Sequence, residues 1–258
     1  MLITISPAKT LDFTNAKKGD ALHYPEFIKE ADYLVQKLKK FNPKKIANMM
    51  DLSQNLAELN YERFQNWNYP FDPEQARQAL SVFKGDVYVG LDADSLSEEG
   101  LSYLDSHLLI LSGLYGVLRT NDSILPYRLE MGRPFAITSN KKNLYQFWNT
   151  KITDYFNQRI EEDNSKVLIN LASNEYFKSI QVKKLKAPVI TPEFKDLKNG
   201  TYKTLSFFAK KARGSMLRYM AENNIQEAEH IKTFDREGYY FNNSLSTKEK
   251  WVFTRDHS

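Results

Sequence analysis

Three short apolar runs in this 258-residue chain each end abruptly in polar residues. The run at residues 2–5 is followed by SPAKT, the run at 108–111 by SGLYG, and the run at 168–171 by ASNEY. Such runs are typical of buried strands. In open α/β sheets, ligands bind beyond the carboxyl ends of strands, where backbone N–H groups are free. The pattern therefore predicts a polar floor for a ligand, although Ser, Gly and Asn also favour ordinary turns, and spacing alone leaves both interpretations open.

Segments with apolar residues at helical spacing alternate irregularly with these apolar runs. This order favours an α/β fold with a mixed sheet flanked by helices. We expect residues 1–258 to form one such domain. The expected strands are 2–5, 86–89, 108–111, 167–171, 189–194, 202–207 and 251–254. The expected helices are 25–41, 44–50, 55–67 (capped by Ser53), 72–83, 144–159 and 209–222, with a short helix from Glu175.

Composition limits the cell compartment and the chemistry. The chain has no Cys, so disulfides, thiolate metal sites and cysteine nucleophiles are excluded. The first residues do not form a signal peptide, and no apolar run approaches the roughly 18 residues of a membrane span. We expect a soluble cytoplasmic protein with no membrane partner; the sequence does not fix its oligomeric state, and a monomer is favoured.

Cofactor and metal motifs are missing from the sequence. There is no phosphate-binding P-loop, no G-x-G-x-x-G and no G-x-S-x-G. The four His residues are scattered, and Glu227-x-x-His230 occurs only once. We therefore predict no cofactor and no metal site.

Positive charge is concentrated in residues 178–220, which carry 11 Lys or Arg residues and only two acidic ones. Such an asymmetry suits an anionic partner. For individual residues such as Lys183 and Lys184, a solvated surface is the preferred interpretation.

Arg128 and Glu130 are two residues apart, so in an extended chain both point to one face. The pair can be a structural ion pair, which is the commoner outcome, or an anion clamp with an acid or base beside it. Lys210 and Arg213 lie three apart on one face of a predicted helix. Gly214 follows, and it either kinks that helix or lets another backbone or a ligand approach closely.

Seven segments resemble the motifs of the YaaA family of bacterial peroxide stress proteins, in the family's order and over nearly the whole chain. They are SPAKTLDF at 6–13, FKGDVYVGL at 83–91, LSGLYGVLR at 111–119, PYRLEMG at 126–132, LYQFW at 144–148, NLASNEYFKSI at 170–180 and SFFAKKARG at 206–214.

The resemblance implies an intracellular α/β protein with a positively charged cleft, linked to the hydrogen peroxide (oxidative stress) response, to lower free iron and to DNA binding. It also implies a helix-hairpin-helix-like element, for which residues 44–67 are the candidate, with Asp51-Leu52-Ser53 in place of the usual glycines. The motif residues become candidates for the cleft: Lys9, Arg128, Glu130, Asn170, Ser173, Glu175, Lys210 and Arg213.

Two functions remain open at this point. The first is DNA binding, with Lys9, Arg128, Asn170, Ser173, Lys210 and Arg213 contacting phosphate. The second is an enzyme acting on a nucleotide or a flipped nucleobase, with Glu130, Glu175 and Lys9 as catalytic groups. A third, iron binding, is disfavoured because no His/Glu cluster has ligand spacing.

Overall fold

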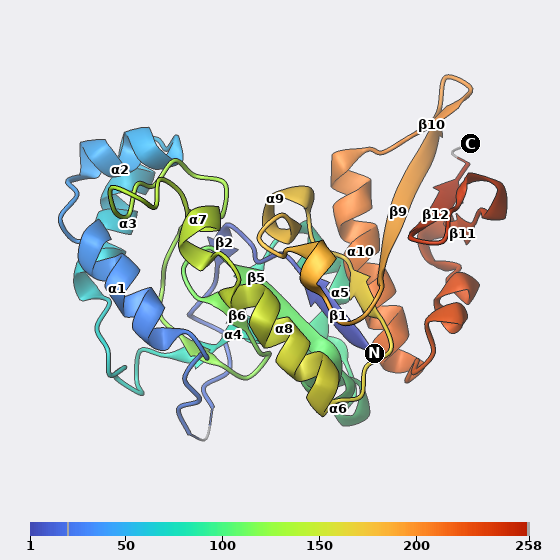
Figure 1. Ribbon diagram of the computed structural model, residues 1–258, viewed down its shortest axis with the longest axis horizontal. Helices are drawn as coiled ribbons and strands as arrows, with labels where there is room; N and C mark the ends of the chain where they lie inside the picture. The colour runs from blue at the N-terminus through green and yellow to red at the C-terminus, as the bar shows by residue number, and fades with distance from the viewer. Residues whose placement is uncertain (20, 257–258) are drawn as a thin grey trace.

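Eight strands form one mixed sheet in the computed structural model, which describes residues 1–19 and 21–256 (Figure 1). They are β1 (Leu2–Ile5), β5 (Leu108–Ser112), β6 (Gly116–Leu118), β8 (Leu168–Asn170), β9 (Val189–Lys198), β10 (Thr201–Lys203), β11 (Tyr240–Phe241) and β12 (Lys250–Arg255). Their order is β11-β12-β9-β8-β1-β5-β6, with β10 paired to β9. The predicted α/β class with a mixed sheet is confirmed.

The middle of this sheet is parallel. β8, β1 and β5 are neighbours, and β9 and β12 continue the parallel part on the other side of β8. Only β6, β10 and β11 pair antiparallel. Leu2, Ile3 and Ile5 of β1 are fully buried. A strand with helices over both faces of its sheet needs such an apolar run.

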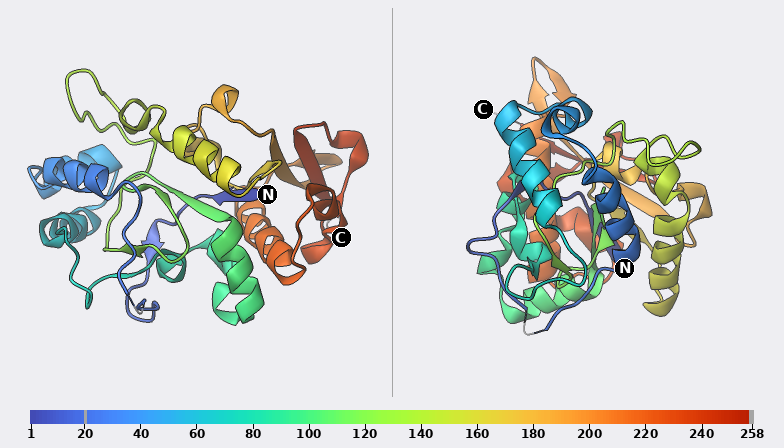
Figure 2. Two further views of the ribbon diagram at one scale, coloured as in Figure 1. Left: turned by 60° about the horizontal axis from the view of Figure 1, so that its bottom comes forward. Right: turned by 90° about the vertical axis from the view of Figure 1, so that its left-hand side faces the viewer.

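Ten α-helices surround the sheet in the described residues. They are α1 (Ile28–Leu38), α2 (Pro43–Met50), α3 (Gln54–Asn66), α4 (Ala79–Val82), α5 (Asp86–Leu91), α6 (Glu98–His107), α7 (Leu144–Trp148), α8 (Lys151–Glu162), α9 (Asn174–Phe177) and α10 (Ser206–Glu222). α8 covers one face of the sheet and α6 and α10 the other (Figure 2). α1, α2 and α3 gather at one end of the molecule (Figure 1). None of the helices in residues 1–19 and 21–256 has the length and apolar character needed to cross a membrane.

Two short ribbons tie loops to the sheet. β2 (Thr10–Leu11), which follows the end of β1, pairs with β4 (Phe83–Lys84). β3 (Arg77–Gln78) pairs with β7 (Ser123–Ile124). The first ribbon ties the chain after β1 to residues 83–84, and the second ties the chain before residue 126 to residues 77–78.

The crossing of α5 and α10 depends on two glycines. A Cβ added to Gly214 would overlap the carbonyl oxygen of Val87, and one added to Gly90 would overlap that of Lys211. The two backbones therefore touch directly, which only glycine permits. Of the alternatives that the sequence left for Gly214, the close approach of another backbone is the one that the structure shows.

Two predicted elements are wrong. Residues 86–89 form the start of α5 instead of a buried strand, and Val89 is 64% exposed. The β-branched residues favour a strand locally, but the packing of α5 on α10 overrides that preference. Residues 72–83 form a turn at Asp72, then β3, α4 and β4, because pairing with β7 and β2 takes the backbone groups that a long helix would use.

Two other predictions need correction at their boundaries. The helix expected over 144–159 is broken into α7 and α8 at Asn149, whose φ is 46°. The strand expected over 202–207 ends at Lys203, and α10 already begins at Ser206. The remaining predicted helices and strands are present within a few residues of their expected bounds.

Candidate functional site

The ends of β8, β1 and β5 meet at one edge of the sheet because the three strands are parallel neighbours. Ser6, directly after β1, and Ser173, shortly after β8, are in contact. The Ser6 hydroxyl accepts a hydrogen bond of 2.8 Å from the Ser173 backbone N–H and donates one of 3.2 Å to the Ser173 hydroxyl. The polar residues after the apolar runs are thus brought together in space.

Glu130 is the centre of the charged groups at this edge and is only 3% exposed. Its Oε1 lies 3.0 Å from Nη2 of Arg128, 3.4 Å from Nη2 of Arg133 and 3.8 Å from Nζ of Lys9. Its Oε2 is buried and has no hydrogen-bond partner. We call Lys9, Arg128, Glu130 and Arg133 the Glu130 cluster; it combines three cations with one carboxylate.

The cations of the Glu130 cluster differ in their contact with solvent. The side chains of Arg128 and Arg133 are 15% and 24% exposed, whereas that of Lys9 is 62% exposed. Arg128 is therefore fixed by its Nε and Nη2 contacts to Glu130. Lys9 lies at the rim, where its charge can reach an anion from solution.

Buried tyrosines pack behind the Glu130 cluster. The Tyr127 hydroxyl shares a 2.8 Å hydrogen bond with the Ser112 hydroxyl, and the Tyr88 hydroxyl donates to the Ser6 carbonyl over 3.0 Å. Burial raises the pKa of Tyr88, Tyr127 and Tyr176 above the usual value. These phenols stay neutral at physiological pH, so they add polar atoms to the site without adding negative charge.

Glu175 lies on the other side of the 130–133 segment. Its Oε1 accepts a 2.9 Å hydrogen bond from the Gly132 N–H, and its backbone carbonyl accepts one of 2.8 Å from the Tyr145 hydroxyl. The side chain is exposed, unlike that of Glu130. Glu175 therefore positions the segment that carries Glu130, and one of its carboxylate oxygens is already in use.

Asn170 supports the end of β8 from within. Its Oδ1 accepts a 3.0 Å hydrogen bond from the Ala172 N–H, and its Nδ2 donates to the Thr191 hydroxyl over 3.3 Å. The side chain is 3% exposed. Oδ1 of Asn170 thus holds the turn that carries Ser173, while Nδ2 ties β8 to β9, and a phosphate contact by Asn170 stays a prediction.

Lys210 and Arg213 lie on α10, further along the same side of the sheet. Lys210 Nζ is 3.9 Å from the Asp86 carboxylate. Burial lowers the pKa of Arg213, while the nearby Glu193 carboxylate opposes the shift. The link to the Glu130 cluster is indirect: a Cβ added to Gly85, which precedes Asp86, would lie 3.5 Å from the Cβ of Ala8, the neighbour of Lys9. A common cleft for Lys9, Arg128, Lys210 and Arg213 remains a prediction.

Arg63 is a cation that the sequence did not single out. It lies on α3, and its Nη1 donates a 3.3 Å hydrogen bond to Asn60 Oδ1. Burial and the positive charge of Arg128 both lower the pKa of Arg63. α3 thus brings a fourth cation towards the Glu130 cluster. Arg128 is distant in the sequence, so only tertiary structure reveals this proximity.

Comparison with known proteins identifies the family. A family model described as peroxide stress protein YaaA matches residues 1–245. The chain is 49% identical to a UPF0246 protein of Hahella chejuensis over 257 residues, covering 100% of both chains. It is also 49% identical to one of Aliivibrio fischeri, covering 99% of this chain and 98% of that protein. The chain belongs to the YaaA family. This membership confirms the resemblance found from the sequence motifs and places the protein in the peroxide stress response.

The segment expected to form the helix-hairpin-helix-like element contains α2 and α3, which pack against each other, and its identity as such an element stays a prediction. Asp51 adopts the left-handed conformation (φ 55°) between them. Ser53 is the residue before α3, as predicted, but its side chain makes no capping hydrogen bond. Through Arg63, α3 of this YaaA-family protein lies near enough to Arg128 for the charge of Arg128 to lower the pKa of Arg63.

Among the described residues, four of the 11 cations in residues 178–220 of this YaaA-family chain form ion pairs with acids outside that segment, Lys210 with Asp86 among them. Lys186 pairs with Glu161, Lys211 with Glu237, and Arg218 with both Asp92 and Glu222. A cluster along the sequence is thus distributed over several surfaces of the molecule.

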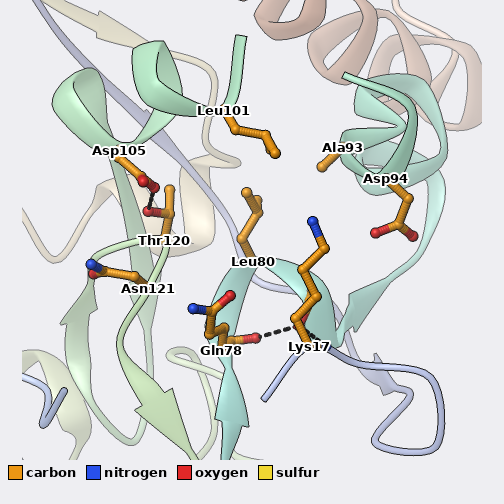
Figure 3. A pocket seen from close by; sticks show the side chains of 10 residues that line it. Lys17, Gln78, Leu80, Ala93, Asp94, Leu101, Asp105, Thr120 and Asn121 are labelled. Atoms are coloured by element: carbon orange, nitrogen blue, oxygen red, sulfur yellow. Dashed lines mark hydrogen bonds between the residues drawn. The ribbon is translucent and has the colours of Figure 1, made fainter. Parts of the chain in front are cut away.

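A small pocket lies away from the Glu130 cluster, between Lys17, Leu80, Asp94 and Thr120 (Figure 3). Its volume is about 90 Å³. Pockets that hold drug-sized ligands measure roughly 300–1,000 Å³, so this one suits water or a small ion at most. Within residues 1–19 and 21–256, no three His, Asp or Glu side chains are grouped so that they could hold a metal.

Proposed function

We propose that this YaaA-family protein binds DNA in the cytoplasm, as a monomer, through the Glu130 cluster and Arg63. The supporting observation is the convergence of three cations on one buried carboxylate, with Arg63 of α3 near Arg128. Guanidinium groups held in place by neighbours bind phosphate in two-point contacts, and less entropy is lost when they are already ordered. Lys9 at the rim supplies the charge that first meets the DNA backbone.

In this proposal, the bound protein also protects DNA from damage linked to intracellular iron. A protein bound along the backbone shields the sugars and bases beneath it from oxidants formed nearby. This role requires no metal ligands on the protein itself. Shielding of DNA by phosphate contacts alone would explain why the family is described as peroxide stress proteins.

The proposal is tested by the salt dependence of DNA affinity in Lys9→Gln and Lys183→Gln. Both residues are exposed, so neither change is expected to disturb the fold. Each lost phosphate contact makes the log–log slope shallower by about one. We expect this for Lys9→Gln, with an unchanged slope for Lys183→Gln, measured by fluorescence anisotropy of a short duplex. Equal effects of both variants, or no DNA binding by the unmodified protein, would contradict it.

A second function, catalysis on a nucleotide or flipped base, is favoured by the Glu130 Oε2 atom. This oxygen is buried, has no hydrogen-bond partner and belongs to a carboxylate whose other oxygen faces three cations. In a plain phosphate site, Oε1 alone orders Arg128, and the free Oε2 would only repel phosphate. A general base needs such an oxygen, close to the reacting proton.

Glu130→Asp separates the two functions because it keeps the negative charge but withdraws the carboxylate by one methylene. DNA affinity is expected to stay within about twofold, since the net charge of the cluster is unchanged. If Glu130 is a general base, survival of peroxide-treated cells falls to that of cells lacking the protein, because proton transfer depends on hydrogen-bond reach. Full protection by a folded Glu130→Asp variant would leave DNA binding as the sole function.

A further inference from the structure

A second pocket, of about 530 Å³, lies between α3 and the segments around residues 13 and 125. Its apolar wall consists of Leu11, Phe13, Leu59, Trp67, Leu125 and Pro126. We call it the Phe13–Trp67 pocket. Its size falls within the range of pockets that hold small organic ligands. Trp67 and Leu125 are only 1% and 3% exposed and form the buried back of this wall, whereas Phe13 is partly exposed and Leu59 is 40% exposed. A base can stack on the Phe13 ring, since every base has a π face.

The wall formed by Trp67 and Leu125 is held in place from behind. The indole N–H of Trp67 donates a 2.9 Å hydrogen bond to the Tyr115 hydroxyl, and the Leu125 backbone N–H donates one of 3.1 Å to the same oxygen. Trp67 also packs edge-on against Phe71. A wall fixed in this way needs little ordering when a ligand binds, which favours affinity.

The charged lining of the Phe13–Trp67 pocket consists of two acidic residues, Glu62 and Glu74, and two cations, Arg63 and Arg77. Arg63 lines the pocket, and its guanidinium is close enough to Arg128 for that charge to lower its pKa. Pro126, two residues before Arg128, lines the same pocket. A ligand with a flat apolar part and an anionic part would therefore find both surfaces adjacent. The side-chain amides of Asn66 and Gln75 also line the pocket and can hydrogen-bond the edge of a base.

We propose that the Phe13–Trp67 pocket binds the base of a nucleotide unit whose phosphate lies against Arg63 and Arg128. This inference rests on the proposed function and deepens it, because a fully paired duplex cannot place a base in a pocket. The nucleotide unit is either an unpaired nucleotide of a DNA strand or a free nucleotide; both present the same base and phosphate. In DNA, the pocket would prefer unpaired nucleotides, because moving their bases out of the stack costs the least free energy.

The test compares two fluorescein-labelled duplexes of equal length, one fully paired and one with a single unpaired adenine nucleotide. Free dAMP is titrated separately by calorimetry. The pocket variant is Leu59→Glu, which places a carboxylate in the pocket wall. The matched control is Leu56→Glu: both leucines lie on α3 and are 40% exposed, but Leu56 does not line the pocket.

We expect the unmodified protein to bind the duplex with the unpaired nucleotide about tenfold more tightly, from stacking of one base. Leu59→Glu should abolish this preference, and Leu56→Glu should keep it. Phe13→Leu keeps an apolar side chain but removes the aromatic ring, and it should reduce the preference without affecting the paired duplex.

The other outcomes separate this inference from DNA binding. Equal affinity of the unmodified protein for both duplexes overturns the pocket inference and leaves DNA binding intact. Binding of dAMP that Leu59→Glu abolishes, without binding of either duplex, supports the pocket with a free nucleotide as ligand and overturns DNA binding. Binding of neither duplex and no dAMP overturns both.

Discussion

Gly214→Ala is expected to lower the free energy of unfolding by more than about 3 kcal/mol, at the upper end of overpacking effects. Alanine alone would stabilise a helix by about 1 kcal/mol relative to glycine. At Gly214 this gain is outweighed because the added Cβ would overlap the Val87 carbonyl of α5. A carbonyl in a helix cannot rotate away, so α5 and α10 must separate.

The matched control for this prediction is Gly100→Ala in α6. There the nearest atom to an added Cβ is the Leu96 Cδ2, at 3.3 Å, at the flexible end of a side chain. Gly100→Ala is expected to be neutral or slightly stabilising. Thermal unfolding followed by circular dichroism should show a Tm lower by roughly 6 °C or more for Gly214→Ala only. Similar Tm values for both variants would contradict the prediction, because α5 and α10 could then separate without a loss of stability.

The second large effect is expected for Glu130→Gln, which should destabilise the protein by roughly 3 kcal/mol, the lower end for breaking a buried ion pair. The change leaves Arg128 and Arg133, both largely buried, beside a neutral amide. Lys9 contributes little to this loss because its side chain is 62% exposed and water stabilises its charge. Urea unfolding of the purified variant measures the effect.

A double-mutant cycle with Arg128→Met identifies the cause. If the ion pair is responsible, the two substitutions are not additive. The free energy of unfolding of the double variant then falls by at least about 1 kcal/mol less than the sum of the decreases in the two single variants. Glu175→Gln is the matched control, since this carboxylate is exposed and glutamine can still accept the hydrogen bond from the Gly132 N–H. It should change stability by no more than about 0.5 kcal/mol. Additive losses in the cycle would contradict a coupled Arg128–Glu130 pair.

The positions of the cations along the sequence do not show which of them are neighbours in the folded protein. In the densest run of cations in the sequence, residues 178–220, Lys186, Lys210, Lys211 and Arg218 pair with acids distant in the sequence. The cations that converge on Glu130 come from two separate segments, around residue 9 and over residues 128–133, and α3 adds Arg63 near Arg128. Distance along the chain is a weak measure of electrostatic proximity because the fold decides which charges are neighbours.

The amino-acid sequence by itself determined the features that depend on local pattern. The apolar runs at β1, β5 and β8 could be recognised because a strand buried on both faces must be apolar along its whole length. The polar residues after them could be recognised as a possible site because parallel strands end together. Arg128 and Glu130 could be paired because alternate residues of an extended chain share a face.

Tertiary structure alone decided the features that depend on contacts between distant segments. Residues 86–89 have strand-forming side chains, yet they are helical because Gly90 and Gly214 let α5 lie directly on α10. The burial of Glu130, its unpaired Oε2, and the approach of Arg63 to Arg128 likewise involve segments that only the folded chain brings together. Local preferences amount to fractions of a kcal/mol per residue, and packing contacts worth several kcal/mol override them.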